Sequence, residues 1–136
     1  MPNPSTLLHH WFEEVWNQGR TEVIDELMAP GAIVHGIEDE HGQALRGPVA
    51  FKAFHQKFRG AFPDIHVAIE DSITSADTIA ARCVVTATHT GDHLGITATN
   101  KPVTFTGMCF VRVKEGKIVE GWNNFDFLKM NQQLGV

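Results

Sequence analysis

The hydrophobic period of the sequence changes near residue 64, and this change limits the possible folds more than any other feature. Before it, apolar residues recur every three or four positions, as they do on the buried face of an amphipathic helix. After it, apolar and polar residues alternate, as they do in strands that bury one face. Because the helices precede the strands, the pattern predicts an α+β domain with a mostly antiparallel sheet.

Three helices are expected in the first half of the chain. They should begin at Ser5 or Thr6, at Thr21 and at Pro48, and should end at the segments 17–20, 29–31 and 61–64. The third helix carries an aromatic stripe with helical spacing that includes a histidine: Phe51, Phe54, His55 and Phe58. A short strand over 32–36 and a polar surface loop over 39–47 should separate the second helix from the third.

The second half of the chain should form strands and end in a helical turn. The expected strands run from residue 64 to a turn at 75–77, over 78–91, over 102–113 and over 118–127. A loop over 92–101 and a hairpin turn over 114–117 join the last three. The apolar residues of the final helical turn are Leu128, Met130 and Leu134.

The two longest expected strands, 78–91 and 102–113, are substantially apolar on both faces. The helices can cover only one face of the sheet. The other face therefore meets solvent through its threonine and arginine positions, or packs against a second copy of the sheet. We expect a homodimer that associates through the sheet.

Length and composition indicate a single domain over residues 1–136. With 43% hydrophobic residues, the chain can bury roughly two-thirds of its unfolded surface in one core. Cys83 and Cys109 lie in apolar strands without metal-ligand spacing, so we expect them to be free buried thiols. The N-terminus lacks the features of a secretion signal, and no apolar run is long enough to cross a membrane. We expect a cytoplasmic protein.

The charge pattern and the histidines narrow the class of ligand. A net charge of -5 without a basic block argues against nucleic acid, and a small apolar organic molecule is the expected ligand. His9 and His10 would point about 100° apart on a helix, and His89 and His93 have no third ligand placed beside them, so no metal is expected. Phosphate-binding glycine patterns and a nucleophile elbow do not occur, so we expect no cofactor.

The last strand carries a carboxylate, Asp126, on the same side as Trp122. If that side faces the helices, the carboxyl group is partly desolvated. Desolvation disfavours its charged form and makes it a better proton carrier near neutral pH. The simpler alternative is an exposed aspartate at the end of the strand, or one that caps the terminal helix.

Four other residues are candidates for a site, each with a structural alternative. His35 can point inward from its short strand and donate a hydrogen bond or relay a proton, or it can be a structural histidine that holds a loop. His55 is either a satisfied core residue or a ligand contact. Trp16 and Met108 either pack in the core or line a pocket.

Four segments that extend over nearly the whole chain carry a family resemblance. They are "FEEVWNQGRTEVIDELMAP", "LRGPVAFKAFHQKFRGAFPDI", "THTGDHLGITATNKPVTFTG" and "VKEGKIVEGWNNFDFLKMNQQLG". The most specific parts are the "FPD" triplet, the "THTG…LG…T…K" loop and the "GKIVE.W…D" strand that leads into "QQLG". Together these segments resemble the SnoaL-like polyketide cyclase branch of the NTF2-like superfamily.

The resemblance implies a cone, in which a curved antiparallel sheet wraps around helices and encloses an apolar pocket, usually in a dimer packed through the sheet. It also implies cofactor-free aldol closure of a polyketide ring with an aspartate as acid and base, and Asp126 matches that aspartate. Family members line the cavity with a tryptophan and a histidine that match Trp16 and His35. Met108 and Phe110 stand where such cyclases carry a further polar residue.

Two functions fit these observations. In the first, an enzyme of the cyclase or isomerase type, Asp126 removes and returns a proton next to a carbonyl group, and His35 hydrogen-bonds the enolate oxygen. The residues expected to hold the apolar substrate are Trp16, Phe54, His55, Met108, Phe110 and Trp122. In the second, the chain is a non-catalytic dimeric module that binds a small ligand or associates with protein.

Overall fold

A computed structural model describes residues 4–39 and 41–136. The helices are α1 (Pro4–Trp11), the π-helical turn η1 (Phe12–Asn17), α2 (Glu22–Leu27), α3 (Gly47–Ala61) and α4 (Phe127–Leu134). The strands are β1 (Met28–Glu38), β2 (Ala44–Arg46), β3 (His66–Ser75), β4 (Thr78–Thr88), β5 (Pro102–Lys114) and β6 (Lys117–Phe125). Within these ranges, no helix is long and apolar enough to cross a membrane.

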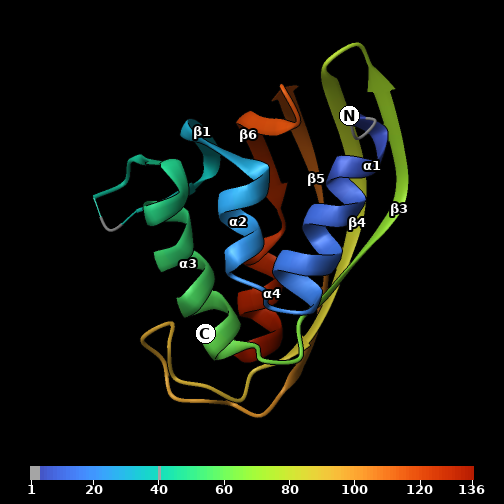
Figure 1. Cartoon of the computed structure of the whole chain (residues 1–136). Helices are drawn as coiled ribbons and strands as arrows, with labels where there is room; N and C mark the ends of the chain where they lie inside the picture. Colours follow the sequence, from blue (N-terminus) through green and yellow to red (C-terminus); the bar gives the residue numbers. More distant parts are fainter. Residues whose placement is uncertain (1–3, 40) are drawn as a thin grey trace.

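The strands form one curved sheet in the order β2-β1-β6-β5-β4-β3. All neighbouring strands are antiparallel except β1 and β6, which are parallel. Figure 1 shows α1, α2 and α3 together over one face of this sheet, with α4 following β6. The predicted α+β cone, with the helices on the concave side of a mostly antiparallel sheet, is confirmed.

The chain between α2 and α3 differs from the expectation. The strand expected over 32–36 begins earlier, at Met28, and part of the expected loop pairs with it as β2. The cause is long-range pairing, because Met28 lies opposite Ile118 of β6 and keeps this part of the chain extended. Pro30 and Gly31 fall where the register shifts, and this irregularity accommodates them in the strand.

The first helix widens into the π-helical turn η1, and α3 completes its hydrogen bonds. In a π-helix each N–H bonds five residues back, and such turns are rare. His55 Nε2 donates to the carbonyl of Val15 at 2.7 Å, and Arg59 Nη1 donates to the carbonyl of Trp16 at 2.6 Å. Two side chains one helical turn apart on α3 therefore hold the turn that carries Trp16.

Two side-chain amides form hydrogen bonds with strand residues that have no neighbouring strand on that side. Asn17 accepts a hydrogen bond from the N–H of Val67 at 2.6 Å and donates to its carbonyl at 3.1 Å, along the free edge of β3. Gln133 accepts from the N–H of Thr104 at 2.8 Å and donates to its carbonyl at 2.8 Å. Thr104 precedes the part of β5 that pairs with β6. Each amide therefore takes the place of a neighbouring strand.

Candidate functional site

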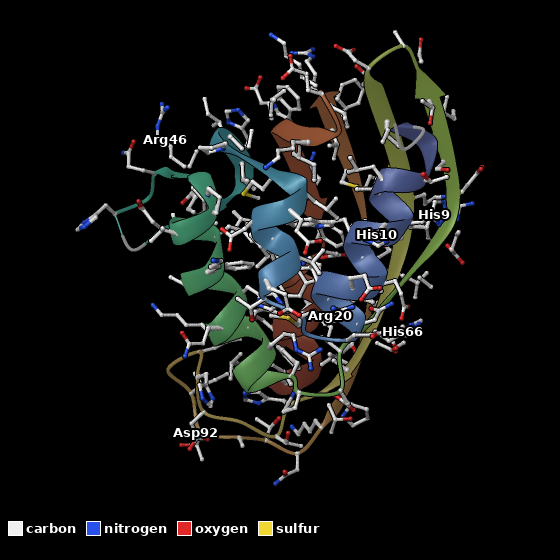
Figure 2. All side chains as sticks on the ribbon, in the orientation of Figure 1. His9, His10, Arg20, Arg46, His66 and Asp92 are labelled. Carbon is white, nitrogen blue, oxygen red and sulfur yellow. The ribbon has the colours of Figure 1, made fainter. Side chains whose placement is uncertain are left out.

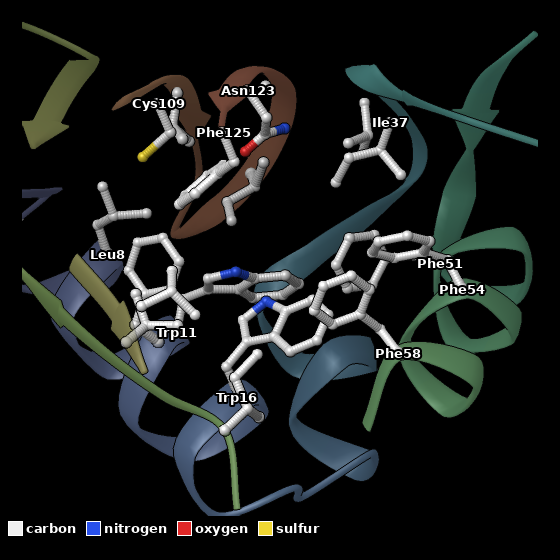
Figure 3. A pocket seen from close by; sticks show the side chains of 18 of the residues that line it. Leu8, Trp11, Trp16, Ile37, Phe51, Phe54, Phe58, Cys109, Asn123 and Phe125 are labelled. Atoms are coloured by element: carbon white, nitrogen blue, oxygen red, sulfur yellow. The ribbon is translucent and has the colours of Figure 1, made fainter. Parts of the chain in front are cut away.

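A cavity lies between the helical layer and the inner face of the sheet (Figure 3). The space open to the centre of a water molecule is about 80 Å³. Its walls are almost entirely apolar. From the helices they include Leu8, Trp11, Phe12, Trp16, Phe51, Phe54 and Phe58, and from the strands Val34, Ile37, Val67, Val85, Phe105, Cys109, Val111, Asn123 and Phe125.

The half-buried residues of the lining mark the mouth of the cavity. They are Ile37, Phe54, Asn123, Phe125 and Phe127, whereas the remaining helical residues of the lining are buried. The mouth therefore lies between α3, the ends of β1 and β6, and the start of α4. Figure 3 shows Ile37, Asn123 and Phe54 around this space.

The deep part of the cavity carries the indole N–H groups of Trp11 and Trp16. These side chains are 6% and 7% exposed, and both pack against Phe51, with ring centroids 5.1 Å and 6.0 Å apart respectively. Figure 3 shows both indoles in the middle of the lining. Among the described residues neither N–H has a hydrogen-bond partner, and neither is sealed off from space. Both are available to a ligand oxygen.

Cys109 is the titratable residue among those that line the cavity. It and Cys83 are buried and free, as predicted. A hydrogen bond with Cys83, together with burial, raises the pKa of the Cys109 thiol far above its usual range. The thiol therefore stays neutral, and it serves neither as a base nor as a nucleophile at neutral pH.

Three of the predicted site residues lie at or next to the cavity. Trp16 and Phe54 are part of the lining, and their rings meet edge to face at 6.0 Å. His55 lies behind the lining, 3% exposed, with its ring 4.9 Å from the Trp16 ring. Burial lowers the pKa of His55, and its Nε2–H is engaged by Val15, so its position matches the structural alternative.

Asp126 does not lie in the cavity, and the predicted placement was wrong. It is exposed, and Oδ1 accepts a hydrogen bond from the backbone N–H of Lys129 at 3.0 Å as the N-cap of α4. The side of β6 that faces the helices carries Gly121, Asn123 and Phe125 instead. The carboxylate is therefore not desolvated by the core, and we assign it no part in the chemistry.

His35, Met108, Phe110 and Trp122 also lie outside the cavity, contrary to prediction. They project from the outer face of the sheet, where Met108 is 58% and Phe110 44% exposed. His35 stacks on Trp122 with centroids 5.3 Å apart and rings inclined by 19°. Its Nε2 lies 2.7 Å from Oε2 of Glu120, at hydrogen-bond distance.

The error has one physical cause, which is that β6 carries an aromatic residue on each face, Trp122 on the outer face and Phe125 on the inner face. A tryptophan normally marks the buried side of a strand. Here Trp122 is instead covered by outer-face neighbours, because Phe110 meets it edge to face at 5.8 Å and Arg112 lies 5.5 Å from its ring centroid. Because alternate residues of a strand share a face, placing Trp122 inward also placed Asp126 inward.

Trp11, Asn123 and Phe125 are lining residues that the sequence did not single out as site residues. The signal for Asn123 and Phe125 was present, because both alternate against Trp122 in the last strand. Gly107 gives a second signal: a Cβ there would lie 2.1 Å from the Phe125 ring, so the glycine makes room for that ring. The exposed histidines His9 and His10 lie on the outside of the molecule (Figure 2).

Comparison with known proteins agrees with this architecture. Aklanonic acid methyl ester cyclase DauD from Streptomyces sp. (strain C5) is 27% identical over 128 residues, which cover 90% of this chain and 76% of the relative. The corresponding cyclase DnrD from Streptomyces peucetius is 27% identical over 128 residues, which cover 90% of this chain and 84% of the relative. The crystal structure of wild-type IdmH from Streptomyces antibioticus superposes with a TM-score of 0.85 at 32% identity, covering 99% of this chain and 100% of IdmH.

The profile of the SnoaL-like polyketide cyclase family matches residues 6–134. This match includes the elements that build the cavity, from α1 to α4. The chain therefore belongs to the SnoaL-like polyketide cyclase family.

Proposed function

We propose that this chain binds an apolar carbonyl compound in the cavity and closes it into a ring by an intramolecular aldol reaction, without a metal or an organic cofactor. The observation that carries the proposal is an apolar cavity whose deep end presents the free N–H groups of Trp11 and Trp16. Family membership supports it, as do two relatives named as cyclases of aklanonic acid methyl ester.

In this proposal the protein acts by position and by hydrogen bonding. The apolar walls hold the chain of the ligand folded, and such positioning is worth an effective concentration of roughly 10⁵ to 10⁸ M. When a carbon next to a carbonyl loses its proton to water at the mouth, the indole N–H of Trp16 donates to the enolate oxygen. The enolate carbon then attacks a second carbonyl, and water returns the proton to the new alkoxide.

The mouth must widen for a ligand of several rings. An apolar cavity of roughly 150 Å³ holds benzene, and the cavity found here has about 80 Å³. Phe54 and Phe125 are two of the half-buried rings at the mouth, and neither side chain carries a polar atom. We propose that these two side chains move apart when the ligand enters.

A specific observation favours a second candidate function, a non-catalytic binding module. Among the described residues that line the cavity there is no carboxylate and no imidazole, so the lining supplies no general base. A protein that only binds an apolar carbonyl compound would need no more than the observed cavity. The two candidates differ in turnover and agree in binding.

The test compares Trp16→Phe with Trp122→Phe on aklanonic acid methyl ester, with ring closure followed by liquid chromatography. Phenylalanine keeps an apolar ring and removes the N–H. If Trp16 donates to the enolate, turnover should fall about a hundredfold, the size typical of a lost oxyanion donor. Trp122→Phe changes the outer face alone and should keep wild-type turnover. Absence of turnover in the wild type, with binding retained, would select the binding module.

We further propose that the outer face of the sheet associates with a second copy of the chain. Its central row follows the strand register from Ile73 through Phe110 and Trp122 to His35, and Ile73 is 71% exposed. Both charge signs flank this row, since Arg82 bonds Glu70 at 2.8 Å. An apolar row bordered by both signs is complementary to its own copy turned by a two-fold axis.

A further inference from the structure

Asn123 is the amide in the lining of the cavity. It projects from the inner face of β6 at the mouth, half-buried, close to the aromatic residues Phe54 and Phe125 that also border the mouth. Apolar neighbours offer no hydrogen bond. The polar atoms of this side chain are therefore satisfied by the backbone, by water or by a ligand.

The orientation of the Asn123 amide is fixed by the backbone of β1. Nδ2 donates to the carbonyl oxygen of His35 at 3.1 Å. A carbonyl only accepts, so the nitrogen must be the atom that faces it, and the amide cannot be turned over. The strands approach closely here because Gly36 has φ +84°, and a Cβ at this glycine would lie 1.8 Å from the carbonyl oxygen of Asn123.

One N–H of Nδ2 is engaged by His35, and Oδ1 is the acceptor atom that the amide offers to the cavity. Among the described residues Oδ1 has no hydrogen-bond donor, and it is not sealed off from space. Figure 3 shows Asn123 with its oxygen and nitrogen on opposite sides of the amide, next to Phe125. The mouth therefore presents a fixed acceptor, while Trp11 and Trp16 present donors at the deep end.

We propose that Asn123 Oδ1 accepts a hydrogen bond from a hydroxyl group of the ligand, and that the cavity selects hydroxylated aromatic carbonyl compounds for this reason. The inference rests on the proposed function, because it requires a ligand in the cavity. It adds the direction of binding: the carbonyl oxygen lies inward, toward the indole N–H groups, and the hydroxyl group lies at the mouth. A ligand without the hydroxyl group leaves Oδ1 desolvated and unpaired.

The experiment uses two ligands that differ by one group of similar size, para-hydroxyacetophenone and para-methylacetophenone. Their dissociation constants are measured by NMR titration for the wild type, for Asn123→Leu and for Asn124→Leu. Leucine removes the acceptor at nearly constant volume, and Asn124 is a matched control because it is exposed on the outer face of the same strand. Thermal unfolding checks that each variant is folded.

The wild type should bind the hydroxylated ligand about threefold to tenfold more tightly, the factor that corresponds to one neutral hydrogen bond. Asn123→Leu should abolish or reverse this preference, and Asn124→Leu should retain it. Equal binding of the two ligands by the wild type would overturn the role of Asn123 and leave the proposed function standing, a result that does not depend on any variant folding. If neither ligand binds, the proposed function of the cavity fails, and the inference fails with it.

Discussion

Asp126 shows that a residue can match a catalytic motif and serve the backbone instead. Its carboxylate accepts from the N–H of Lys129, one of the N–H groups that the first turn of α4 leaves without an intrahelical partner. A negative charge at this end also interacts favourably with the helix dipole. The acid between two phenylalanines is therefore explained by the start of α4.

Replacing Asp126 should separate the capping role from a catalytic one. Asp126→Ala removes the cap and should lower the free energy of unfolding by about 1 kcal/mol. Asp126→Asn keeps an oxygen that can accept the same hydrogen bond, so it should retain stability and turnover. Urea unfolding and the ring-closure assay check both expectations. A hundredfold loss of turnover in Asp126→Asn would mean that the carboxylate takes part in the reaction after all.

His55 marks the limit of prediction for single residues. Helical spacing correctly placed it on the aromatic face of α3, which made both a core role and a ligand contact reasonable. The deciding contact is with the carbonyl of Val15 at 2.7 Å, and that carbonyl lies in the last turn of η1, where carbonyls have no partner within the helix. The contact joins two helices across a separation of 40 residues, so helical spacing alone could not predict it.

Among the secondary-structure elements, those with a strong local period were predictable and those set by distant pairing were not. The helical stripe of α3 and the alternation of β5 give both elements close to their observed bounds. β2 and the early start of β1 depend on contacts with strands far along the chain. The inward side of β6 was misjudged because each of its faces carries an aromatic residue, and with it the candidate site was misplaced.

The amides of Asn17 and Gln133 each connect a helical element to a strand. Each amide bonds both the N–H and the carbonyl of one residue, Val67 or Thr104, as a paired strand would, and Asn17 Nδ2 also donates to Glu13. This explains why the second position of the "QQLG" motif carries an amide. It also shows that α4 is attached to β5 by hydrogen bonds as well as by packing.

Gln133→Ala should therefore destabilise the fold more than the same substitution at Gln132. The change leaves the N–H and the carbonyl of Thr104 to water, and should lower the free energy of unfolding by about 1 to 3 kcal/mol. Gln132→Ala is the matched control, since Gln132 is exposed and its side chain makes no hydrogen bond among the described residues. Denaturant unfolding measures both. Equal stability of the two variants would show that the Gln133 amide contributes nothing.

For the whole molecule, the sheet separates two apolar surfaces. The inner surface lines the cavity, and the outer one holds Met108, Phe110 and Trp122 beside an open groove of about 350 Å³. The expectation of a homodimer came from the apolar character of both strand faces. The structure places these side chains on the outer face, where a second copy would cover them.

Charge placed on the outer face should prevent this association. In the double variant Met108→Glu and Phe110→Glu, the copies would bring carboxylates into an apolar contact, and the dimer dissociation constant should rise at least about tenfold. Val49→Glu is the control, because Val49 is 83% exposed on α3 and far from this face in the fold. Sedimentation velocity measures the oligomeric state. A wild-type chain that sediments as a monomer would refute the proposed dimer.

In the proposed reaction, the chemistry of the cavity lining decides which carbon of a ligand can react. Among its described residues the lining contributes donors, an amide oxygen and a neutral thiol, so the acidity needed for enolate formation must reside in the ligand itself. A methylene flanked by two ketones loses a proton far more readily than the carbon beside an isolated one. In such a cavity only a ligand with an acidic C–H group forms the enolate, and a poly-β-ketone has such groups.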